Sequence, residues 1–174
     1  DGSTEITWVA ETVSVPNPTG GLMSTFSSYG PTADMRFKPD IAAPGGSIYS
    51  TYPLERAPYA TLSGTSMAAP HAAGAAALML QADPGLTPSD VKTRLQNSGE
   101  QMLWNLNAGT GLLDMVHKQG AGLIQVDEAI LADVEAEPGM IQLGQQLAGE
   151  TTTHTVTLTN EGDNMRIVFD DESS

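Results

Sequence analysis

The segment at residues 66–81, SMAAPHAAGAAALMLQ, limits the fold of this chain more than any other stretch. Small and apolar residues lie on every face at helical spacing, and no Asp, Glu, Lys or Arg interrupts them, so the pattern predicts a helix that is buried on all sides. Pro70 is tolerated near the beginning of a helix, which places the helix start close to Ser66. Gly74 costs about 1 kcal/mol relative to alanine inside a helix, and we expect close helix packing to be the reason for it.

The composition is that of a globular chain without a membrane span. Of the 174 residues, 40% are hydrophobic, and no apolar run is long enough to cross a bilayer. The 7 Lys plus Arg and 21 Asp plus Glu give a net charge of −14, which opposes nucleic acid or an anionic membrane as a partner. Without cysteine there is neither a disulfide nor thiol chemistry. The chain begins with Asp1 and shows no leader pattern, so we expect a mature or excised piece.

Short strands are expected before this helix. Residues 4–15 place apolar side chains at period two ahead of the turn signals at residues 16–21, which predicts extended structure. The apolar pieces at residues 40–42 and 48–52 lie between Gly- and Pro-containing turns, and each predicts a short strand.

A second helix is predicted at the TPSD motif. Thr87 can cap it, Pro88 suits its first turn, Asp90 favours its positive end, and it should end near Gly99. After a loop rich in Gly and Asn, we expect a short extended piece and a last helix around residues 127–131.

The character of the sequence changes from Met140 onward. His154, Val156 and Leu158 alternate with threonines in a β pattern. About 35 residues follow the EAEPG boundary, whereas a β-sandwich domain needs roughly 100, so we expect a truncated second domain.

The motif GTSMAAPH, residues 64–71, raises the question of whether Ser66 is a nucleophile. Acyl transfer needs a base within hydrogen-bond reach of the serine and N–H donors where the oxyanion forms. Gly64 and Thr65 leave the main-chain N–H groups accessible, and the positive end of the helix favours negative charge at Ser66. A plain N-cap serine explains the same local pattern.

None of the histidines is an evident base for Ser66. If both lie on one helix, the side chains of Ser66 and His71 are about 140° apart around the axis and about 7.5 Å apart along it, so they cannot meet. We therefore expect His71 to be a packed or hydrogen-bonded helix residue. Geometry does not exclude His117, in a polar loop, or His154, and a surface histidine is the simpler interpretation of each.

A second enzymatic interpretation is a nucleophile elbow, which GTSMA resembles with alanine in the last place. Hydrolases of that type run Ser, then Asp or Glu, then His, and Asp114 and His117 follow Ser66 in this order. The elbow needs a solid strand before the serine, and residues 59–62 offer barely four positions for one.

Four separated pieces of the chain agree with one family. They are FSSYGPT at residues 26–32, KPDIAAPGG at 38–46, YATLSGTSMAAPHAAGAAALML at 59–80 and GAGLIQVDEAI at 120–130. In order and spacing they resemble the C-terminal half of the catalytic domain of a subtilisin-like serine protease (subtilase, peptidase family S8). The resemblance spans residues 22–131, and GTSMAAPH is highly specific for the serine motif of that family.

The resemblance implies a role for each residue of the motif. Ser66 matches the catalytic serine, and its backbone N–H matches the main-chain half of the oxyanion hole. Thr65 matches a neighbour that can assist, Gly64 precedes it, and Met67 adjoins the nucleophile. His71 matches a helix histidine that is not catalytic.

The family's other catalytic groups have no match here. In subtilases the Asp, the His and the Asn that completes the oxyanion hole all precede the serine. No histidine occurs before Ser66, and neither Asp34 nor Asp40 matches the catalytic aspartate, so both are expected to be structural. We therefore expect this chain alone to be inactive.

The implied fold is α/β, the C-terminal half of a three-layer parallel-sheet domain followed by the start of a β-sandwich. The flanks resemble large secreted or cell-envelope subtilases with a protease-associated insert and a fibronectin type III-like domain. The expected divisions are residues 1–21, an extended segment re-entering the catalytic domain; 22–137, its C-terminal part; and 138–174, the truncated β domain. The implied partners are a protein or peptide substrate and the upstream part of the same domain.

Two alternatives to an active extracellular peptidase stay open. One is a non-catalytic pseudoprotease, scaffold or adhesion segment that keeps the helix for packing alone, and the other is the elbow-type esterase. No cofactor is implied. Many subtilases bind structural calcium, but no Asp-rich loop of suitable spacing occurs here.

Overall fold

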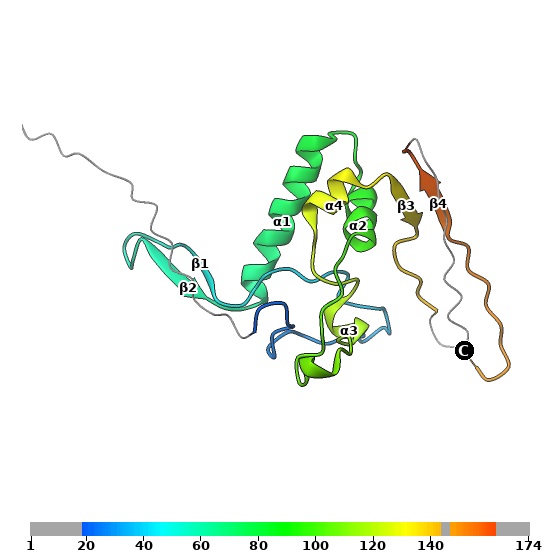
Figure 1. Cartoon of the computed structure of the whole chain (residues 1–174), viewed down its shortest axis with the longest axis horizontal. Coiled ribbons are helices and arrows are strands. Elements are labelled where there is room, and N and C mark those ends of the chain that lie inside the picture. The colour runs from blue at the N-terminus through cyan, green and yellow to red at the C-terminus, as the bar shows by residue number, and fades with distance from the viewer. Residues whose placement is uncertain (1–18, 144–146, 163–174) are drawn as a thin grey trace, which may run out of the picture.

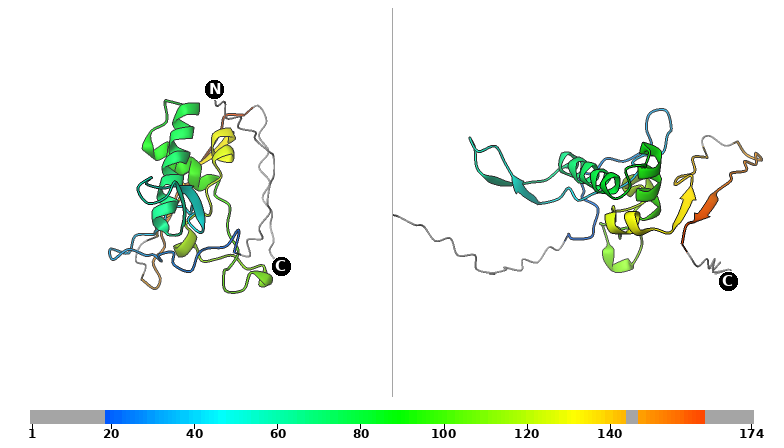
Figure 2. Two further views of the ribbon diagram at one scale, coloured as in Figure 1. Left: turned by 90° about the vertical axis from the view of Figure 1, so that its left-hand side faces the viewer. Right: turned by 90° about the horizontal axis from the view of Figure 1, so that it is seen from above.

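A computed structural model describes residues 19–143 and 147–162. In Figure 1 three parts follow one another across the molecule: a β-hairpin, a group of helices and a second pair of strands. The right-hand view of Figure 2 shows the same order from above, whereas the left-hand view looks along it. The elements are β1 (Ile48–Thr51), β2 (Tyr59–Leu62), α1 (Thr65–Ala82), α2 (Pro88–Asn97), the 3-10 helix η1 (Ala108–Thr110), α3 (Val116–Gln119), α4 (Val126–Leu131), β3 (Val134–Glu137) and β4 (Thr157–Asn160).

The long helix α1 begins where its sequence predicts, but it is not buried on all sides. In the part of the chain that the structure describes, only Ala75 and Met79 of α1 are buried, whereas Leu78 is 53% exposed and Leu80 is 42% exposed. The prediction of all-round burial is therefore wrong here, because the described neighbours of α1 cover a single stripe. The packing reason for Gly74 is wrong too, since a Cβ added there would meet nothing within 4 Å.

The helices pack around a small apolar core. Ala75 and Met79 of α1 meet Leu95 of α2 and Ala129 of α4. Six partly buried residues pack against this cluster: Ile41, Leu86, Val91, Ile124, Val126 and Ile130. Removing these side chains from water favours the arrangement, and it anchors one face of α1 while the other stays open.

The predicted start of α2 is confirmed in detail. Thr87 Oγ1 accepts a hydrogen bond from Asp90 N–H at 3.3 Å, and Asp90 Oδ2 accepts one from Thr87 N–H at 2.7 Å, which forms a capping box. The helix ends at Asn97, two residues before the expected Gly99. The last predicted helix is also present, as α4.

Within residues 19–143 and 147–162, the strands form two separate antiparallel pairs, β1 with β2 and β3 with β4. The predicted strand at residues 48–52 is confirmed as β1. In the described part of the chain, residues 40–42 form an isolated parallel bridge from Ala42 to Leu123 rather than a strand, so the prediction of a strand there is wrong. The predicted extended structure at residues 4–15 lies outside the described residues. Mixed helices and strands agree with an α/β class in this coarse sense.

The pair β3–β4 joins the helices through the side of α2. Arg94 Nε lies 3.3 Å from Glu135 Oε2, and Asn97 Nδ2 donates to the carbonyl of Ala136 at 3.0 Å. Leu158 lies in β4, as the alternating pattern predicts, while His154 and Val156 precede that strand. Residues 134–137 and 157–160 pair in register, so the pairing crosses the domain boundary expected after residue 137.

Candidate active site

Ser66 is the second residue of α1 and is exposed. Gly64 occupies the N-cap position, and no side chain caps the helix, so the interpretation of Ser66 as an N-cap is wrong. The carbonyl of Gly64 accepts the first helical hydrogen bonds, from Met67 N–H at 3.0 Å and Ala68 N–H at 3.4 Å. The N–H groups of Thr65 and Ser66 precede these donors and have no partner within the helix.

Pro70 modifies the same turn. It is the sixth residue of α1 and has no N–H to donate to the carbonyl four residues earlier, which belongs to Ser66. The first turn at Ser66 is therefore held less by the helix ladder than a turn further along, and the surrounding loops must position it.

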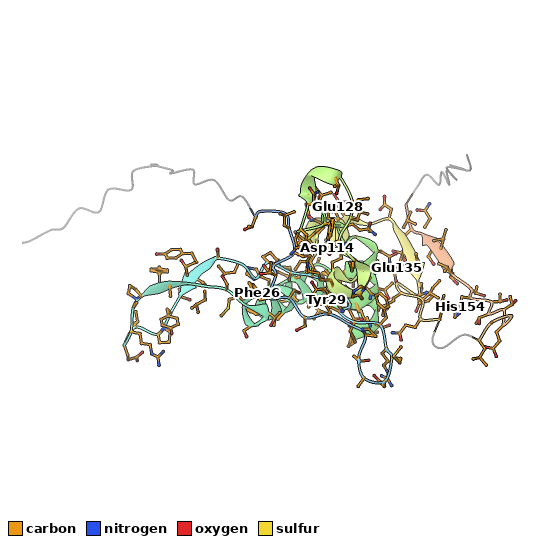
Figure 3. All side chains as sticks on the ribbon, turned by 90° about the horizontal axis from the view of Figure 1, so that it is seen from below. Phe26, Tyr29, Asp114, Glu128, Glu135 and His154 are labelled. Atoms are coloured by element: carbon orange, nitrogen blue, oxygen red, sulfur yellow. The ribbon has the colours of Figure 1, made fainter. Side chains whose placement is uncertain are left out.

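In the described structure, none of the three histidines is paired with Ser66. His71 Nδ1 donates to the carbonyl of Met67 at 2.8 Å, which confirms a hydrogen-bonded helix histidine. His117 belongs to α3 rather than to a polar loop, and its ring lies 5.9 Å from the Tyr29 ring, centroid to centroid. His154 lies at the opposite end of the molecule from the hairpin (Figure 3). Among the residues described, no histidine makes a hydrogen bond to Ser66.

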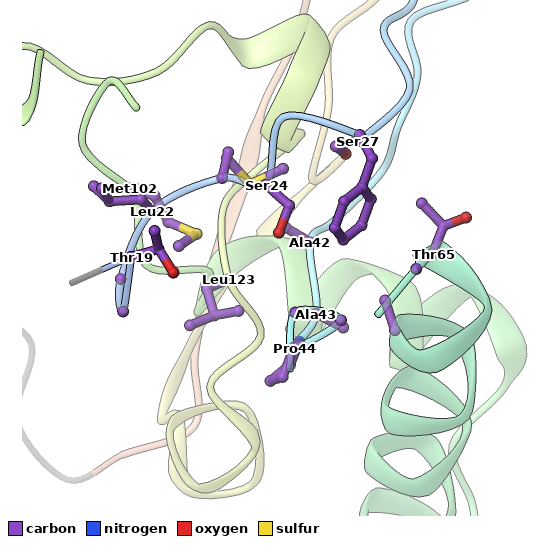
Figure 4. Close-up of a pocket in the computed structure, with 18 residues that line it drawn as sticks. Thr19, Leu22, Ser24, Ser27, Ala42, Ala43, Pro44, Thr65, Met102 and Leu123 are labelled. Atoms are coloured by element: carbon purple, nitrogen blue, oxygen red, sulfur yellow. The ribbon is translucent and has the colours of Figure 1, made fainter. Parts of the chain in front are cut away.

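Two cavities border the turn that carries Ser66. A cavity of about 730 Å³ separates α1 from the β1–β2 hairpin, and its lining includes Ser66, Met67 and His71 of the helix and Tyr49 and Leu62 of the hairpin. A smaller cavity of about 240 Å³ is lined by Gly64, Thr65 and residues from the segments before the hairpin. In Figure 4, Thr65 at the start of α1 lies across from Ser24, Ala43 and Pro44. Both cavities leave room for a ligand chain beside the serine turn.

A buried polar cluster, which we call the polar junction, consists of Asp114, Lys118 and Gln119. Lys118 Nζ lies 2.8 Å from Asp114 Oδ2, and both side chains are almost fully buried. Gln119 accepts from Met102 N–H at 2.7 Å and donates to the carbonyl of Asp114 at 2.6 Å. Burial opposes ionisation of Asp114, but the hydrogen bonds from Lys118 and the Met115 N–H outweigh it and lower the pKa of that carboxyl.

The polar junction was not predicted from the sequence, although Asp and Lys at spacing i, i+4 are a known pair in helices.

The contacts of Asp114 also test the elbow interpretation. Asp114 Oδ1 accepts from the N–H of Met115 and Oδ2 pairs with Lys118, so Asp114 is not the partner of His117. The strand before Ser66 has four residues and pairs in an antiparallel hairpin. Ser66, Asp114 and His117 thus do not form an elbow-type triad.

Asp34 and Asp40, which precede the serine, make ion pairs with other residues. Asp34 Oδ2 lies 2.9 Å from Arg36 Nε in an exposed loop. Asp40 pairs with Lys38 and, at 2.7 Å, with Lys92 of α2. Burial raises the pKa of Asp40, but the two lysines outweigh it and lower the pKa of that carboxyl below its usual value. These ion pairs agree with the structural role expected of Asp34 and Asp40.

Within its described residues, the chain offers neither a cluster for a metal ion nor a helix for a membrane span. No group of three or more His, Cys, Asp or Glu residues there could hold a metal ion. No helix in that part is both long and apolar enough to cross a membrane.

The chain has relatives among known proteins. A model of the subtilase family (peptidase S8) matches residues 4–122. The chain is 35% identical over 157 residues to the minor extracellular protease Vpr of Bacillus subtilis (strain 168), covering 86% of this chain and 19% of that protein. It is 34% identical over 174 residues to the C5a peptidase of Streptococcus pyogenes serotype M6 (strain ATCC BAA-946 / MGAS10394), covering 91% of this chain and 14% of that protein.

Among solved structures, the chain is similar to fervidolysin from Fervidobacterium pennivorans, a keratinolytic enzyme related to subtilisin. The sequences are 32% identical, the TM-score is 0.38, and the match covers 50% of this chain and 14% of that one. The chain spans about a fifth or less of the length of the two sequence relatives above.

Proposed function

Because this chain belongs to the subtilase family, we propose that it carries the nucleophile of a serine endopeptidase, Ser66. The observation that carries the proposal is the exposed position of Ser66 in the first turn of α1, where N–H groups have no partner within the helix and two cavities border the turn. A helix start favours negative charge on the serine and on an oxyanion beside it. Thr65 and Gly64 leave that space open.

The proposed reaction is acyl transfer to Ser66 and then to water. Ser66 Oγ attacks the peptide carbonyl carbon while a histidine base takes the hydroxyl proton, and the Ser66 N–H donates to the oxyanion. The tetrahedral intermediate collapses, the C–N bond breaks, and the base returns the proton to the leaving amine. Water then hydrolyses the acyl-enzyme by the reverse order of proton transfers. The chemistry requires no cofactor; a structural calcium ion elsewhere in the protein is compatible with it.

We assign the base and its aspartate partner to sequence outside this chain. No histidine precedes Ser66, although both partners precede the serine in the family's order. The chain by itself therefore has no activating base for Ser66 and should be inactive. Substrates would be proteins or peptides.

We propose that the upstream part of the catalytic domain packs against the exposed face of α1. Leu78 and Leu80 are substantially exposed on that face, and the 730 Å³ cavity beside it is largely apolar. Burying such residues is favourable, and a three-layer domain with a parallel sheet would supply the missing layer. We propose residues 22–137 as the C-terminal part of this domain and residues 1–21 as a segment that re-enters it.

The C-terminal residues are assigned to a second domain. We propose that residues 138–174 open a fibronectin type III-like β-sandwich, with β4 as one of its strands. The antiparallel pairing of β3 with β4 supports a β structure here. We also propose an extracellular or cell-envelope location, supported by the relative that is named an extracellular protease.

Labelling by a fluorophosphonate probe tests the nucleophile. The full-length protein that contains this chain should be labelled at Ser66, and the label should be absent after Ser66→Ala. Ser89→Ala is the matched control, because Ser89 is an exposed serine in the first turn of α2. Labelling that survives Ser66→Ala would show that another residue is the nucleophile.

The non-catalytic alternative predicts a different result in the same experiment. A pseudoprotease or scaffold would be folded and soluble but would not react with the probe, in the wild type or in either variant. The isolated chain should also fail to cleave a peptide substrate. Robust cleavage by that chain, abolished by Ser66→Ala, would contradict the assignment of the base to sequence outside it.

A further inference from the structure

Two hydrogen bonds hold the loop before β1 against the loop before α1. The N–H of Gly64 donates to the carbonyl of Gly45 at 2.8 Å, and the N–H of Ser47 donates to Ser63 Oγ at 2.8 Å. We call this pair of bonds the loop clamp. It joins residues 45–47 to residues 63–64, immediately ahead of Ser66.

Gly64 connects the loop clamp to the helix. Its N–H is bound by Gly45, while its carbonyl accepts from the N–H groups of Met67 and Ala68. Gly64 therefore belongs both to the loop clamp and to the start of α1. Because Ser66 lies two residues further on, within this turn, a shift of Gly64 shifts the serine and its N–H together.

Gly45 can approach Gly64 only because it has no side chain. A Cβ built on Gly45 would lie 2.8 Å from the carbonyl oxygen of Gly64 and 3.2 Å from Ala68 Cβ. The first contact is with backbone that α1 itself holds, so it cannot be relieved by turning a side chain. Gly45 does not adopt a left-handed φ, so crowding is the only penalty for alanine at this position.

The other end of the same segment is fixed on the core. Ala42 N–H donates to the carbonyl of Gly122 at 2.8 Å, and the Ala42 carbonyl accepts from Ile124 N–H at 2.9 Å. Asp40 ties the segment to α2 through Lys92. Residues 40–47 are thus anchored at both ends, and Gly45 cannot move away from α1 without breaking one of these attachments.

We propose that Gly45 is a positioning residue for Ser66, which acts through the loop clamp and Gly64 on the first turn of α1. This role rests on the proposed function, since it concerns the nucleophile of that reaction. Pro70 makes the turn depend on the clamp, because it removes the helical donor to the Ser66 carbonyl.

The test uses the full-length protein with Gly45→Ala. A displacement of the nucleophile by about 1 Å can cost about 100-fold in rate. We expect kcat and the second-order rate of fluorophosphonate labelling to fall by about this factor, with KM little changed. The matched control is Gly109→Ala in η1, where a Cβ would lie 3.5 Å from its nearest neighbour, Asn107 Oδ1. That variant should label at the wild-type rate.

A double variant separates the backbone contact from the side-chain contact. Ala68→Gly removes the 3.2 Å neighbour and leaves the Gly64 carbonyl in place. Labelling of Gly45→Ala with Ala68→Gly should remain as slow as that of Gly45→Ala alone. Full rescue would overturn the role of Gly64.

If Gly45→Ala does not fold, two variants of Ser63 test whether the loop clamp positions Ser66. Ser63→Ala removes the acceptor of the second clamp bond, whereas Ser63→Thr keeps a hydroxyl. We expect slower labelling in the alanine variant and recovery in the threonine variant. Wild-type labelling rates in Gly45→Ala, or in both Ser63 variants, overturn the positioning role alone. A wild-type protein that is not labelled overturns the proposed function and this role with it.

Discussion

The serine turn at the start of α1 and the polar junction are held in opposite ways. Ser66 is exposed, and the bonds that position its turn are mostly between backbone groups of glycine-containing loops. Asp114 and Lys118 are buried and bind each other directly through their charges. We therefore expect a substitution near the serine turn to change the position of Ser66 and the rate of its reaction. A substitution in the polar junction should instead change the free energy of unfolding.

The largest stability effect is expected at the polar junction. Asp114→Asn leaves the ammonium of Lys118 buried without its counter-charge, which should cost about 3–5 kcal/mol in the free energy of unfolding. Urea denaturation of the full-length protein measures this. A loss of unfolding free energy no larger than that expected for an exposed ion pair would contradict the difference proposed between the two regions.

Acid should act on the same pair. The pKa of Asp114 is lowered in the folded protein relative to its ordinary value of 3.8, so the pair stabilises the fold above that value. The stabilisation is lost as the pH falls through the lower folded pKa. Unfolding measured from pH 5 downward should therefore show a decline in the wild type that is shallower in Asp114→Asn. Equal slopes would assign the acid sensitivity to other carboxylates.

Oxidation of Met67 should affect rate without a matching effect on stability. Met67 follows Ser66 and lines the larger cavity, so a bulkier polar sulfoxide there should lower kcat/KM by about tenfold or more. Peroxide treatment followed by peptide mapping and assay measures it, and Met67→Leu should protect. Full activity with Met67 oxidised would show that the serine turn tolerates a change beside it.

The start of α2 offers a smaller test, because it is capped by side chains and the start of α1 is not. Thr87→Ala removes the capping box acceptor and should lower the free energy of unfolding by about 1 kcal/mol. Labelling of Ser66 should remain at the wild-type rate. A slower labelling rate would mean that the two helix starts are coupled.

The smallest effect is expected at the exposed pair of Asp34 and Arg36. Asp34→Asn should cost less than about 1 kcal/mol, because water screens both charges. It serves as the surface counterpart of Asp114→Asn. If Asp34→Asn lowers the free energy of unfolding as much as Asp114→Asn does, solvent exposure does not explain the difference expected between the two ion pairs.

Much of the local structure is predictable from the sequence. The start of α1, the capping box at Thr87 and the separation of His71 from Ser66 all depend on residues within about five positions of one another. The subtilase motif around Ser66 was visible for the same reason. The prediction of burial on all sides of α1 failed in the described chain, because burial depends on which elements lie nearby.

By itself, the sequence determined the family, the candidate nucleophile and the helix on which it lies, because a short motif and helical spacing carry that information. Only the tertiary structure decided that Gly64 caps α1, that Gly45 approaches it closely, and that Lys118 is buried on Asp114. These contacts depend on how the loops and helices pack in space. Composition and periodicity describe each segment alone, so they do not specify the distance between two segments.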